Sequence, residues 1–214
     1  MRYGEMSCGR FLEELSSKQA VPGGGGASAL AGALGAALGS MVGNLTLGKK
    51  KYADVEAKIL ALNERADPLR GKLLSLADAD AEAFLPLSEV YSMPKDTPEE
   101  QAARAEAMES ALDAACAVPM EIMEAACRVV ELLEVYAEKG STLAVSDAGV
   151  GAALCSAAIR GASLNVFINT RSMADREKAS ALDAKAGAML AEFVPRAERV
   201  YESVAARLSA KKEG

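Results

Sequence analysis

The stretch that decides the fold runs from Pro22 to Asn44 and reads PGGGGASALAGALGAALGSMVGN. It carries no charged residue and consists largely of alanine and glycine. Gly35, Gly39 and Gly43 recur at four-residue spacing, which on an α-helix forms a stripe without side chains. Its segment from Ala27 to Gly43 is close to the roughly 17-residue lower limit for crossing a bilayer, but alanine and glycine bury little apolar surface and polar residues interrupt it. We therefore favour a buried helix of a soluble protein over a membrane span, with another helix close to the glycine stripe.

Composition extends this interpretation to the whole chain. Of the 214 residues, 50% are hydrophobic and 25% are charged, as in an ordinary soluble domain. Only 4% are aromatic and tryptophan is absent, so the core is built from alanine, leucine, valine and methionine. Such a core favours close-packed helices over a sheet. No strand pattern and no linker interrupts the sequence, which predicts one all-α domain over residues 1–214.

Helix signals recur along the chain and predict a bundle of about six helices, several of them kinked by proline. Thr97-Pro98-Glu99-Glu100 is a strong helix start, with an N-cap threonine, proline at the first helical position and glutamate at the third. The first expected helix is capped by Ser7, and the second runs from the glycines to about Lys50. The others are expected from Asp54 to about Tyr91 (with Pro68 and Pro86), from Thr97 to about Lys139 (with Pro119), from Asp147 to about Asn165 or Asn169, and from about Ala174 to Ala210.

Several classes of site are excluded or disfavoured by composition. The chain has no histidine, which excludes a Ser-His-Asp triad, a zinc site with imidazole ligands and a histidine base. The formal charge of −6 argues against nucleic acid as the main partner. The four cysteines show no C-x-x-C pairing, and the first residues contain no apolar leader segment, so we expect a cytoplasmic protein with reduced thiols.

Two clusters of residues are candidates for binding an anion. The run Gly23-Gly24-Gly25-Gly26 before a helix exposes backbone N–H groups to a ligand, or forms a tight turn that brings two helices together; the pattern favours neither. The run Lys49-Lys50-Lys51 is more typical of a solvated helix end beside the negative pole of the helix dipole. Its alternative interpretation is a site for an anionic substrate.

Carboxylates and amides in apolar surroundings are the other candidates. Asp78 and Asp80 lie two residues apart in an alanine-rich helix, so they point to opposite faces and can differ in burial. A buried Asp80 would have a raised pKa and could act as an acid or base. Asp147 is more typical of a helix N-cap than of a catalytic group. Asn165 and Asn169 share one helical face and could bind a polar heterocycle or cap a helix end.

Taken in order, these segments resemble a known family. VPGGGGASALAGALGAAL at 21–38, followed by LTLGKKKY at 45–52, is similar to the cyclodeaminase domain of the formiminotransferase-cyclodeaminase family and to the related stand-alone methenyltetrahydrofolate cyclohydrolases. Asp80 with Ala83-Phe84, residues 139–149, and Asn165 with Asn169 also fit. The resemblance covers nearly the whole chain, and we expect no formiminotransferase domain.

The resemblance implies an all-helical homodimer that handles folates. The first reaction that it implies, and the one we favour, is conversion of 5-formiminotetrahydrofolate to 5,10-methenyltetrahydrofolate with loss of ammonia. The alternative is hydrolysis of the methenyl compound in the same pocket. Both pass through a tetrahedral carbon between N5 and N10. Without histidine, the proton transfers fall to carboxylates, and we expect Asp80 as the acid or base, with Asp147 as a second candidate. The expected substrate-binding residues are Pro22, Gly23, Gly24, Gly25, Gly26, Lys49, Lys50, Lys51, Asn165 and Asn169.

Expectations about partners complete the hypothesis. A tetrahydrofolate derivative is the substrate, and we expect no metal, no permanently bound cofactor, no nucleic acid and no membrane. We expect the homodimer contact to include Gly35, Gly39 and Gly43, although this stripe could instead face a helix of the same chain. A separate formiminotransferase is a candidate partner. The alternative from another class is a helical dimer that binds folate or a protein without turnover.

Overall fold

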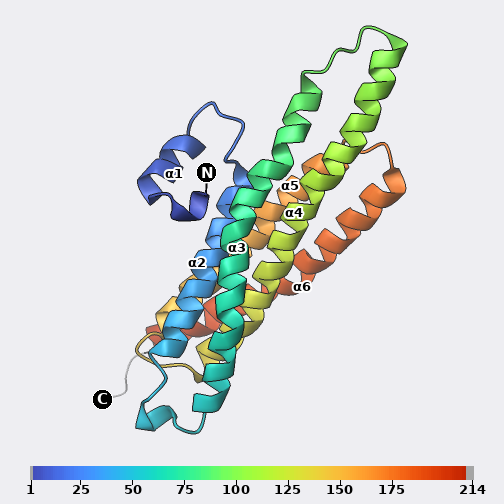
Figure 1. The fold of residues 1–214 in the computed structure, drawn as a ribbon. Helices are drawn as coiled ribbons and strands as arrows, with labels where there is room; N and C mark the ends of the chain where they lie inside the picture. The colour runs from blue at the N-terminus through green and yellow to red at the C-terminus, as the bar shows by residue number, and fades with distance from the viewer. Residues whose placement is uncertain (1, 211–214) are drawn as a thin grey trace.

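The computed structural model describes residues 2–210, and within this range the chain forms six α-helices and no strand (Figure 1). Short 3-10 turns, η1 (Tyr3–Glu5) and η2 (Lys50–Tyr52), accompany them. The α-helices are α1 (Cys8–Leu15), α2 (Gly24–Asn44), α3 (Glu56–Tyr91), α4 (Pro98–Lys139), α5 (Val145–Thr170) and α6 (Arg176–Ser209). The predicted all-α bundle is confirmed.

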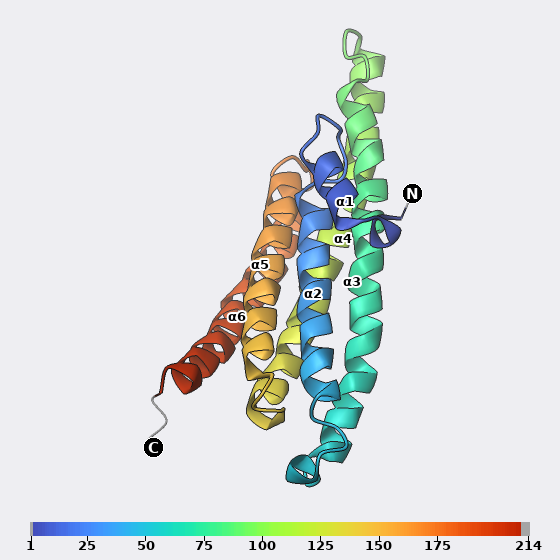
Figure 2. The same cartoon turned by 90° about the vertical axis from the view of Figure 1, so that its left-hand side faces the viewer.

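The long helices pack as a bundle in which α2 and α5 form one outer layer over α4 (Figure 2). Packing is most extensive between α2 and α5, α4 and α5, α2 and α3, and α5 and α6. We call the end where α2 begins and α5 ends the upper end, and the opposite end the lower end. The α3–α4 hairpin extends beyond α2 at the upper end, where α1 stands out beside α2 (Figures 1 and 2).

Local helix signals are confirmed in part. Thr97 caps α4 through a complete capping box with Glu100, and Ser7 caps α1. Helices α3, α4 and α6 each continue through an internal proline. The expected end of α2 near Lys50 is wrong, because the helix ends at Asn44 and Gly48 then adopts a positive φ of 71°. The lysine run therefore lies in a loop and in η2, not at a helix end.

The glycine stripe of α2 faces helices of its own chain. A Cβ at Gly35 would lie 2.5 Å from the Cys155 sulfur and 2.9 Å from the Gly151 carbonyl oxygen on α5. Gly39 and Gly43 instead lie against the buried ring of Tyr136 on α4. The expectation that this stripe forms the dimer contact is therefore wrong. It lets α2 approach α5 and α4 within one subunit.

Two Gly→Ala substitutions should change stability in opposite directions. Gly35→Ala places a methyl against α5 backbone, so we expect it to lower the free energy of unfolding by about 1–3 kcal/mol through overpacking. Gly71→Ala, on the exposed face of α3 where a Cβ meets nothing within 4 Å, should raise it by about 0.5–1 kcal/mol. Urea unfolding followed by circular dichroism measures both changes. Equal effects would contradict the close approach of α2 and α5.

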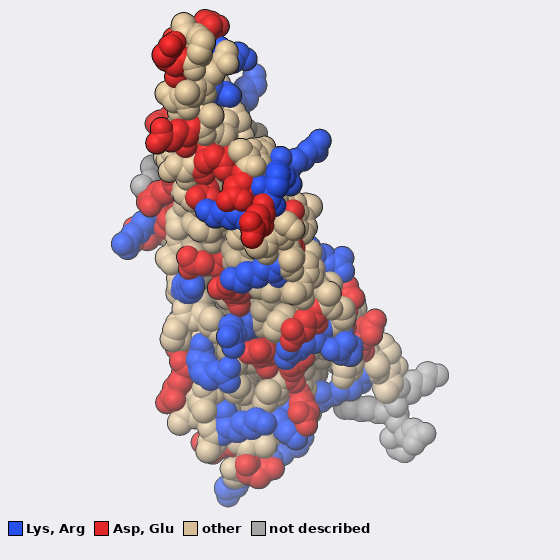
Figure 3. Space-filling view, turned by 90° about the vertical axis from the view of Figure 1, so that its right-hand side faces the viewer, with Lys and Arg blue, Asp and Glu red and all other residues tan. Residues whose placement is uncertain are grey.

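Two helices are long and apolar enough to cross a membrane by length and composition, namely α2 and α5. Their most apolar windows have a mean hydropathy of 1.4, and 61% and 44% of these windows are buried in the fold. Lysine, arginine, aspartate and glutamate instead cover the opposite side of the bundle, where α4 and α6 lie (Figure 3). Helix α2 itself contains no charged residue, and α5 contains two, Asp147 and Arg160.

Candidate functional site

Asp80 meets the glycine run at the first turn of α2. Its side chain projects from α3, and its Oδ2 accepts the N–H of Gly26 at 3.0 Å. A Cβ at Gly25 would overlap the same carboxylate. Gly24, Gly25 and Gly26 thus belong to α2 itself, with Gly23 as its N-cap, and their lack of side chains admits the carboxylate to the helix N-terminus. The expected tight turn is wrong, because Gly24, Gly25 and Gly26 are helical. Within this chain the run packs α2 against α3, and the group that its N–H meets is the Asp80 carboxylate.

The environment of Asp80 poises this group for proton transfer. Burial disfavours the charged carboxylate and raises its pKa above the ordinary value, while the N–H of Gly26 partly opposes this shift. The carboxylate is half-buried, so solvent or substrate protons can reach it. A carboxyl group with a raised pKa can both accept and release a proton closer to neutral pH.

Asn165 and Asn169 present two amides to the same place from the upper end of α5. Asn165 donates its Nδ2–H to the Gly161 carbonyl at 3.0 Å, and Asn169 donates to the Ala115 carbonyl of α4 at 2.8 Å. These bonds orient the side chains and leave their carbonyl oxygens available as acceptors. A Cβ at Gly24 would lie 3.6 Å from Asn165 Nδ2, so the amide borders the glycine run.

A cavity of about 230 Å³ joins these groups. Its walls come from the segment before α2 and from α2, α3, α4 and α5, and they contain no lysine or arginine. Phe84, one turn after Asp80, and Pro119 are wall residues that the sequence reasoning did not assign to the site; the i, i+4 spacing from Asp80 was the available signal for Phe84. The lining residues are Ala20, Val21, Gly23, Gly24, Asp80, Phe84, Ala115, Pro119, Asn165, Ile168 and Asn169. Pro22 is buried beside it.

The remaining predicted site residues lie at the lower end of the bundle. Asp147 is in the first turn of α5, and about 27 Å of helix separates it from Asn165 at 1.5 Å per residue. Ala144, not Asp147, is the N-cap of α5, so the capping prediction is wrong. Lys49, Lys50 and Lys51 also lie here. One chain therefore does not bring Asp147 or the lysines to the Asp80 cavity.

The lower cluster has its own structure, which we call the basic corner and define as Lys49, Lys50, Lys51 and Tyr52 with the loop residues Ser141 and Thr142. Lys49 Nζ lies 3.5 Å from Ser141 Oγ, and Lys51 lies over the Tyr52 ring at 5.4 Å from its centroid. The Tyr52 hydroxyl accepts the N–H of Thr142 at 3.0 Å. Hydrogen bonds with the Thr142 hydroxyl, the Thr142 N–H and Ser141, together with the Lys51 charge, lower the Tyr52 pKa to about 8.

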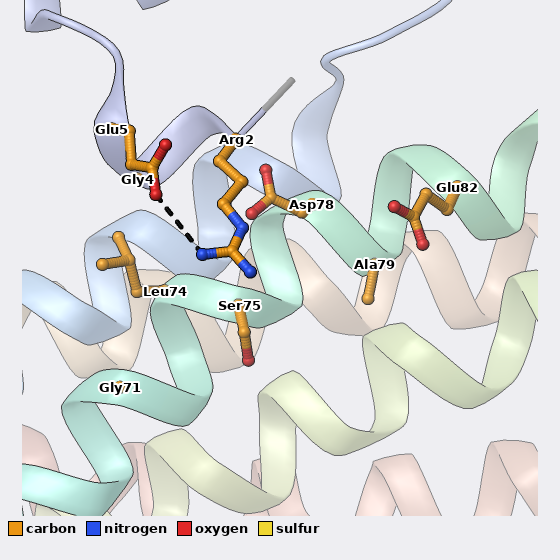
Figure 4. Close-up of a pocket in the computed structure, with 9 residues that line it drawn as sticks. All are labelled: Arg2, Gly4, Glu5, Gly71, Leu74, Ser75, Asp78, Ala79 and Glu82. Atoms are coloured by element: carbon orange, nitrogen blue, oxygen red, sulfur yellow. Dashed lines mark hydrogen bonds and ion pairs between the residues drawn. The ribbon is translucent and has the colours of Figure 1, made fainter.

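Asp78 has a different role from Asp80. It points to the N-terminal segment, where its Oδ1 accepts the N–H of Tyr3 at 2.6 Å. A cavity of about 640 Å³ lies between this segment and α3, with Arg2 reaching toward Glu5 across it (Figure 4). The expected division of the two aspartates between opposite faces of α3 is confirmed, although both are half-buried.

A third cavity, of about 700 Å³, lies further up the α3–α4 hairpin. It contains the cations Lys95 and Arg104, but the carboxylates of Glu106 and Glu109 also line it and balance their charge.

Comparison with known proteins places this geometry in a family. A model described as formiminotransferase-cyclodeaminase matches residues 7–188. The chain belongs to this family. It is therefore an enzyme of the folate one-carbon cyclodeaminase and cyclohydrolase group. Its candidate active site is the cavity formed by Asp80, the glycines of α2 and the two asparagines.

Three relatives illustrate the similarity. A methenyltetrahydrofolate cyclohydrolase from Methylorubrum extorquens is 41% identical over 93% of this chain and 96% of the relative. The formimidoyltransferase-cyclodeaminase of Mus musculus is 34% identical over 92% of this chain, which spans 36% of that longer protein. The crystal structure of a formiminotetrahydrofolate cyclodeaminase from Thermotoga maritima superposes with a TM-score of 0.77 at 28% identity, covering 94% of this chain and 98% of that chain.

Proposed function

We propose that this chain is a methenyltetrahydrofolate cyclohydrolase in which Asp80 transfers the proton. The observation that carries the proposal is the half-buried Asp80 carboxylate, held by Gly26 in a cavity that also presents two oriented amides. Sequence identity to the relatives supports hydrolysis over deamination. This reverses the order of the two reactions that we expected from the sequence alone. The cyclohydrolase relative is 41% identical and matches over nearly its full length, against 34% and 28% for the two cyclodeaminases above.

The chemistry requires one base and one acid in turn. Asp80 accepts a proton from water while the water oxygen bonds to the carbon that bridges N5 and N10. Asp80 then returns this proton to N5, the bond between N5 and the carbon breaks, and the new hydroxyl loses its proton to solvent. The products are 10-formyltetrahydrofolate and one proton. A raised pKa suits this alternation, because the carboxyl group must gain and lose a proton in one cycle.

The binding groups suit the same substrate. The methenyl compound carries a positive charge at the bridging amidine, and the negative carboxylate of Asp80 complements it. The free oxygens of Asn165 and Asn169 can accept N–H groups of the pterin ring. Phe84 and Pro119 supply apolar wall surface for a flat ring.

Cyclodeaminase activity is the second candidate, favoured by the likeness to the Thermotoga maritima structure over 98% of that chain. In this reaction N10 attacks the formimino carbon, the N10 proton moves to the formimino nitrogen, and Asp80 donates a second proton to that nitrogen, so that its bond to the carbon breaks and ammonia leaves. The same cavity would serve, since both reactions share the tetrahedral carbon between N5 and N10.

An absorbance assay with each folate separates the candidates. We expect the purified protein to accelerate loss of the methenyltetrahydrofolate band far above the buffer rate, and to form that band from 5-formiminotetrahydrofolate more slowly or not at all. Faster formation from the formimino compound would assign the cyclodeaminase reaction instead. Tight folate binding with neither reaction above background would favour the non-catalytic binding protein.

A further inference from the structure

The Asp80 cavity is too small for a folate while its walls stay where they are. Its volume of about 230 Å³ lies below the roughly 300–1,000 Å³ of pockets that enclose a drug-sized ligand, and a folate is at least as large as such a ligand. The wall residues belong to the long helices or to the N-cap of α2, with two exceptions. These are Ala20 and Val21, which come from the segment before α2. This wall can therefore move without unpacking the bundle.

The two exceptions end a segment that we call the N-terminal arm, residues 2–21, which comprises η1, α1 and the connection to α2 (Figure 2). Among residues 2–20, Phe11 alone is buried, and its ring meets the edge of the Tyr3 ring of the same arm at 5.7 Å between centroids. The hydrogen bonds of residues 16–20 also stay within the arm. A segment with so few buried contacts to the rest of the fold opens at a low cost in free energy.

The arm is attached to the bundle at η1. There the Tyr3 N–H donates to Asp78 Oδ1 at 2.6 Å, and for residues 2–20 this is the one hydrogen bond that leads to the bundle. Gly4 lies on Leu74 of α3, where a Cβ would be 2.7 Å from the leucine Cγ. Beside this contact, a cavity of about 640 Å³ separates the arm from α3 (Figure 4). Asp78 therefore holds a segment that has little other attachment.

This attachment lies close to the group proposed for proton transfer. Asp78 and Asp80 are two residues apart on α3, and Tyr3 is near both. Burial raises the pKa of the Tyr3 phenol, and the charges of Glu14 and of the two aspartates add to this shift. The pKa of Asp80, in contrast, depends on its burial and on the N–H of Gly26. Removing the Asp78 charge should therefore leave the proton transfer intact.

We propose that the N-terminal arm is the lid of the Asp80 cavity and that Asp78 is the positioning residue that holds this lid closed. The inference rests on the proposed function for the identity of the substrate. When Tyr3 leaves Asp78, the arm can move away from the cavity, while Pro22, buried at the start of α2, fixes its other end. Because the closed cavity is too small for the substrate, the open fraction of the protein sets the apparent affinity.

Weakening the closed form should improve substrate binding. Asp78→Ala removes the acceptor of the Tyr3 N–H, so we expect the KM for methenyltetrahydrofolate to fall about threefold to tenfold at the parental kcat. Asp78→Asn keeps an acceptor oxygen and should retain the parental KM. Damage to the fold would raise KM or lower kcat, whereas a lower KM requires a closed form that competes with binding. An unchanged or raised KM in folded Asp78→Ala protein would overturn the lid.

Locking the lid closed should have the opposite effect. A Cys8→Ser background removes the exposed cysteine and leaves the three buried ones. In this background, Gly4→Cys and Leu74→Cys place two thiols at the contact between η1 and α3, and mild oxidation should join them within one chain. The oxidised protein should have its kcat/KM lowered about tenfold or more, and dithiothreitol should restore it. Either single variant should respond to neither treatment.

Two results with the double-cysteine variant would overturn the lid. If no intrachain disulfide forms, as checked by mass spectrometry, the contact that holds the arm on α3 is wrong. If the disulfide forms and kcat/KM is the same before and after its reduction, the substrate enters without any movement of the arm.

Deuterium exchange separates the lid from the proposed function. If the parental protein catalyses neither folate reaction and binds no tetrahydrofolate in equilibrium dialysis, the proposed function fails. The lid is still tested, because peptides from residues 2–21 should exchange faster in Asp78→Ala protein and slower in the oxidised double-cysteine variant, while peptides from α4 exchange as in the parental protein. Equal exchange of the arm in all three proteins would overturn the lid.

Discussion

Replacing Asp80 with Asn should lower kcat by about 10²–10⁴-fold, the usual share of a general acid or base in catalysis. The amide keeps the shape of the side chain, and its oxygen can still accept the N–H of Gly26, so the fold and the cavity should persist. What disappears is the group that accepts and returns the proton. Steady-state rates with methenyltetrahydrofolate, alongside circular dichroism, measure this change. A folded variant with near-parental kcat would move the proton transfer to another residue.

The same substitution should raise stability at neutral pH. Burial raises the pKa of Asp80 in the folded state, so the folded protein binds this proton more tightly than the unfolded chain. The parental protein therefore loses stability as pH rises from the unfolded pKa through the raised folded pKa, whereas the amide of the Asp80→Asn variant does not titrate. Thermal unfolding of both proteins should coincide at acid pH, with the variant melting higher above the folded pKa. A lower melting temperature for the variant at pH 7 would show that charged Asp80 is stabilised, not penalised, by its surroundings.

The second large effect is expected from Gly25→Ala. A methyl group at this position overlaps the Asp80 carboxylate, which must move away from the N-terminus of α2. Since a misplacement of about 1 Å in a catalytic group costs on the order of 10²-fold, we expect kcat/KM to fall by about that factor. Helix propensity should partly offset the cost to stability, because alanine favours a helix over glycine.

Gly71→Ala is the matched control for this variant. It lies on the same helix as Asp80, faces solvent, and adds a methyl that meets nothing within 4 Å. It should keep the parental kcat and KM. If Gly25→Ala also kept parental kinetics, the carboxylate would have room beside the glycine run, and the close packing of Asp80 on α2 would not matter for the reaction.

Much of the architecture could be predicted from neighbouring residues. Thr97 and Glu100 lie three residues apart, so their capping box depends on local backbone geometry that any context preserves. The alanine-rich composition and the helical spacing of apolar residues likewise determine helices before tertiary contacts form. Asp80, Asn165 and Asn169 were selected as polar groups in apolar helices, and the structure does bring these three together in one cavity.

The tertiary structure alone decided which helix faces meet and which residues share a site. A stripe such as Gly35 and Gly39 indicates a close approach, but its partner depends on the path of the whole chain, and here that partner is α5 and α4 of the same subunit. Asp147 and the lysines are charged residues that the sequence analysis grouped with Asp80 in one site. They lie at the lower end of the bundle instead, because α2 ends and α5 begins there. The sequence determines which chemical group stands at each position, whereas the packing of entire helices determines which of these groups lie close together.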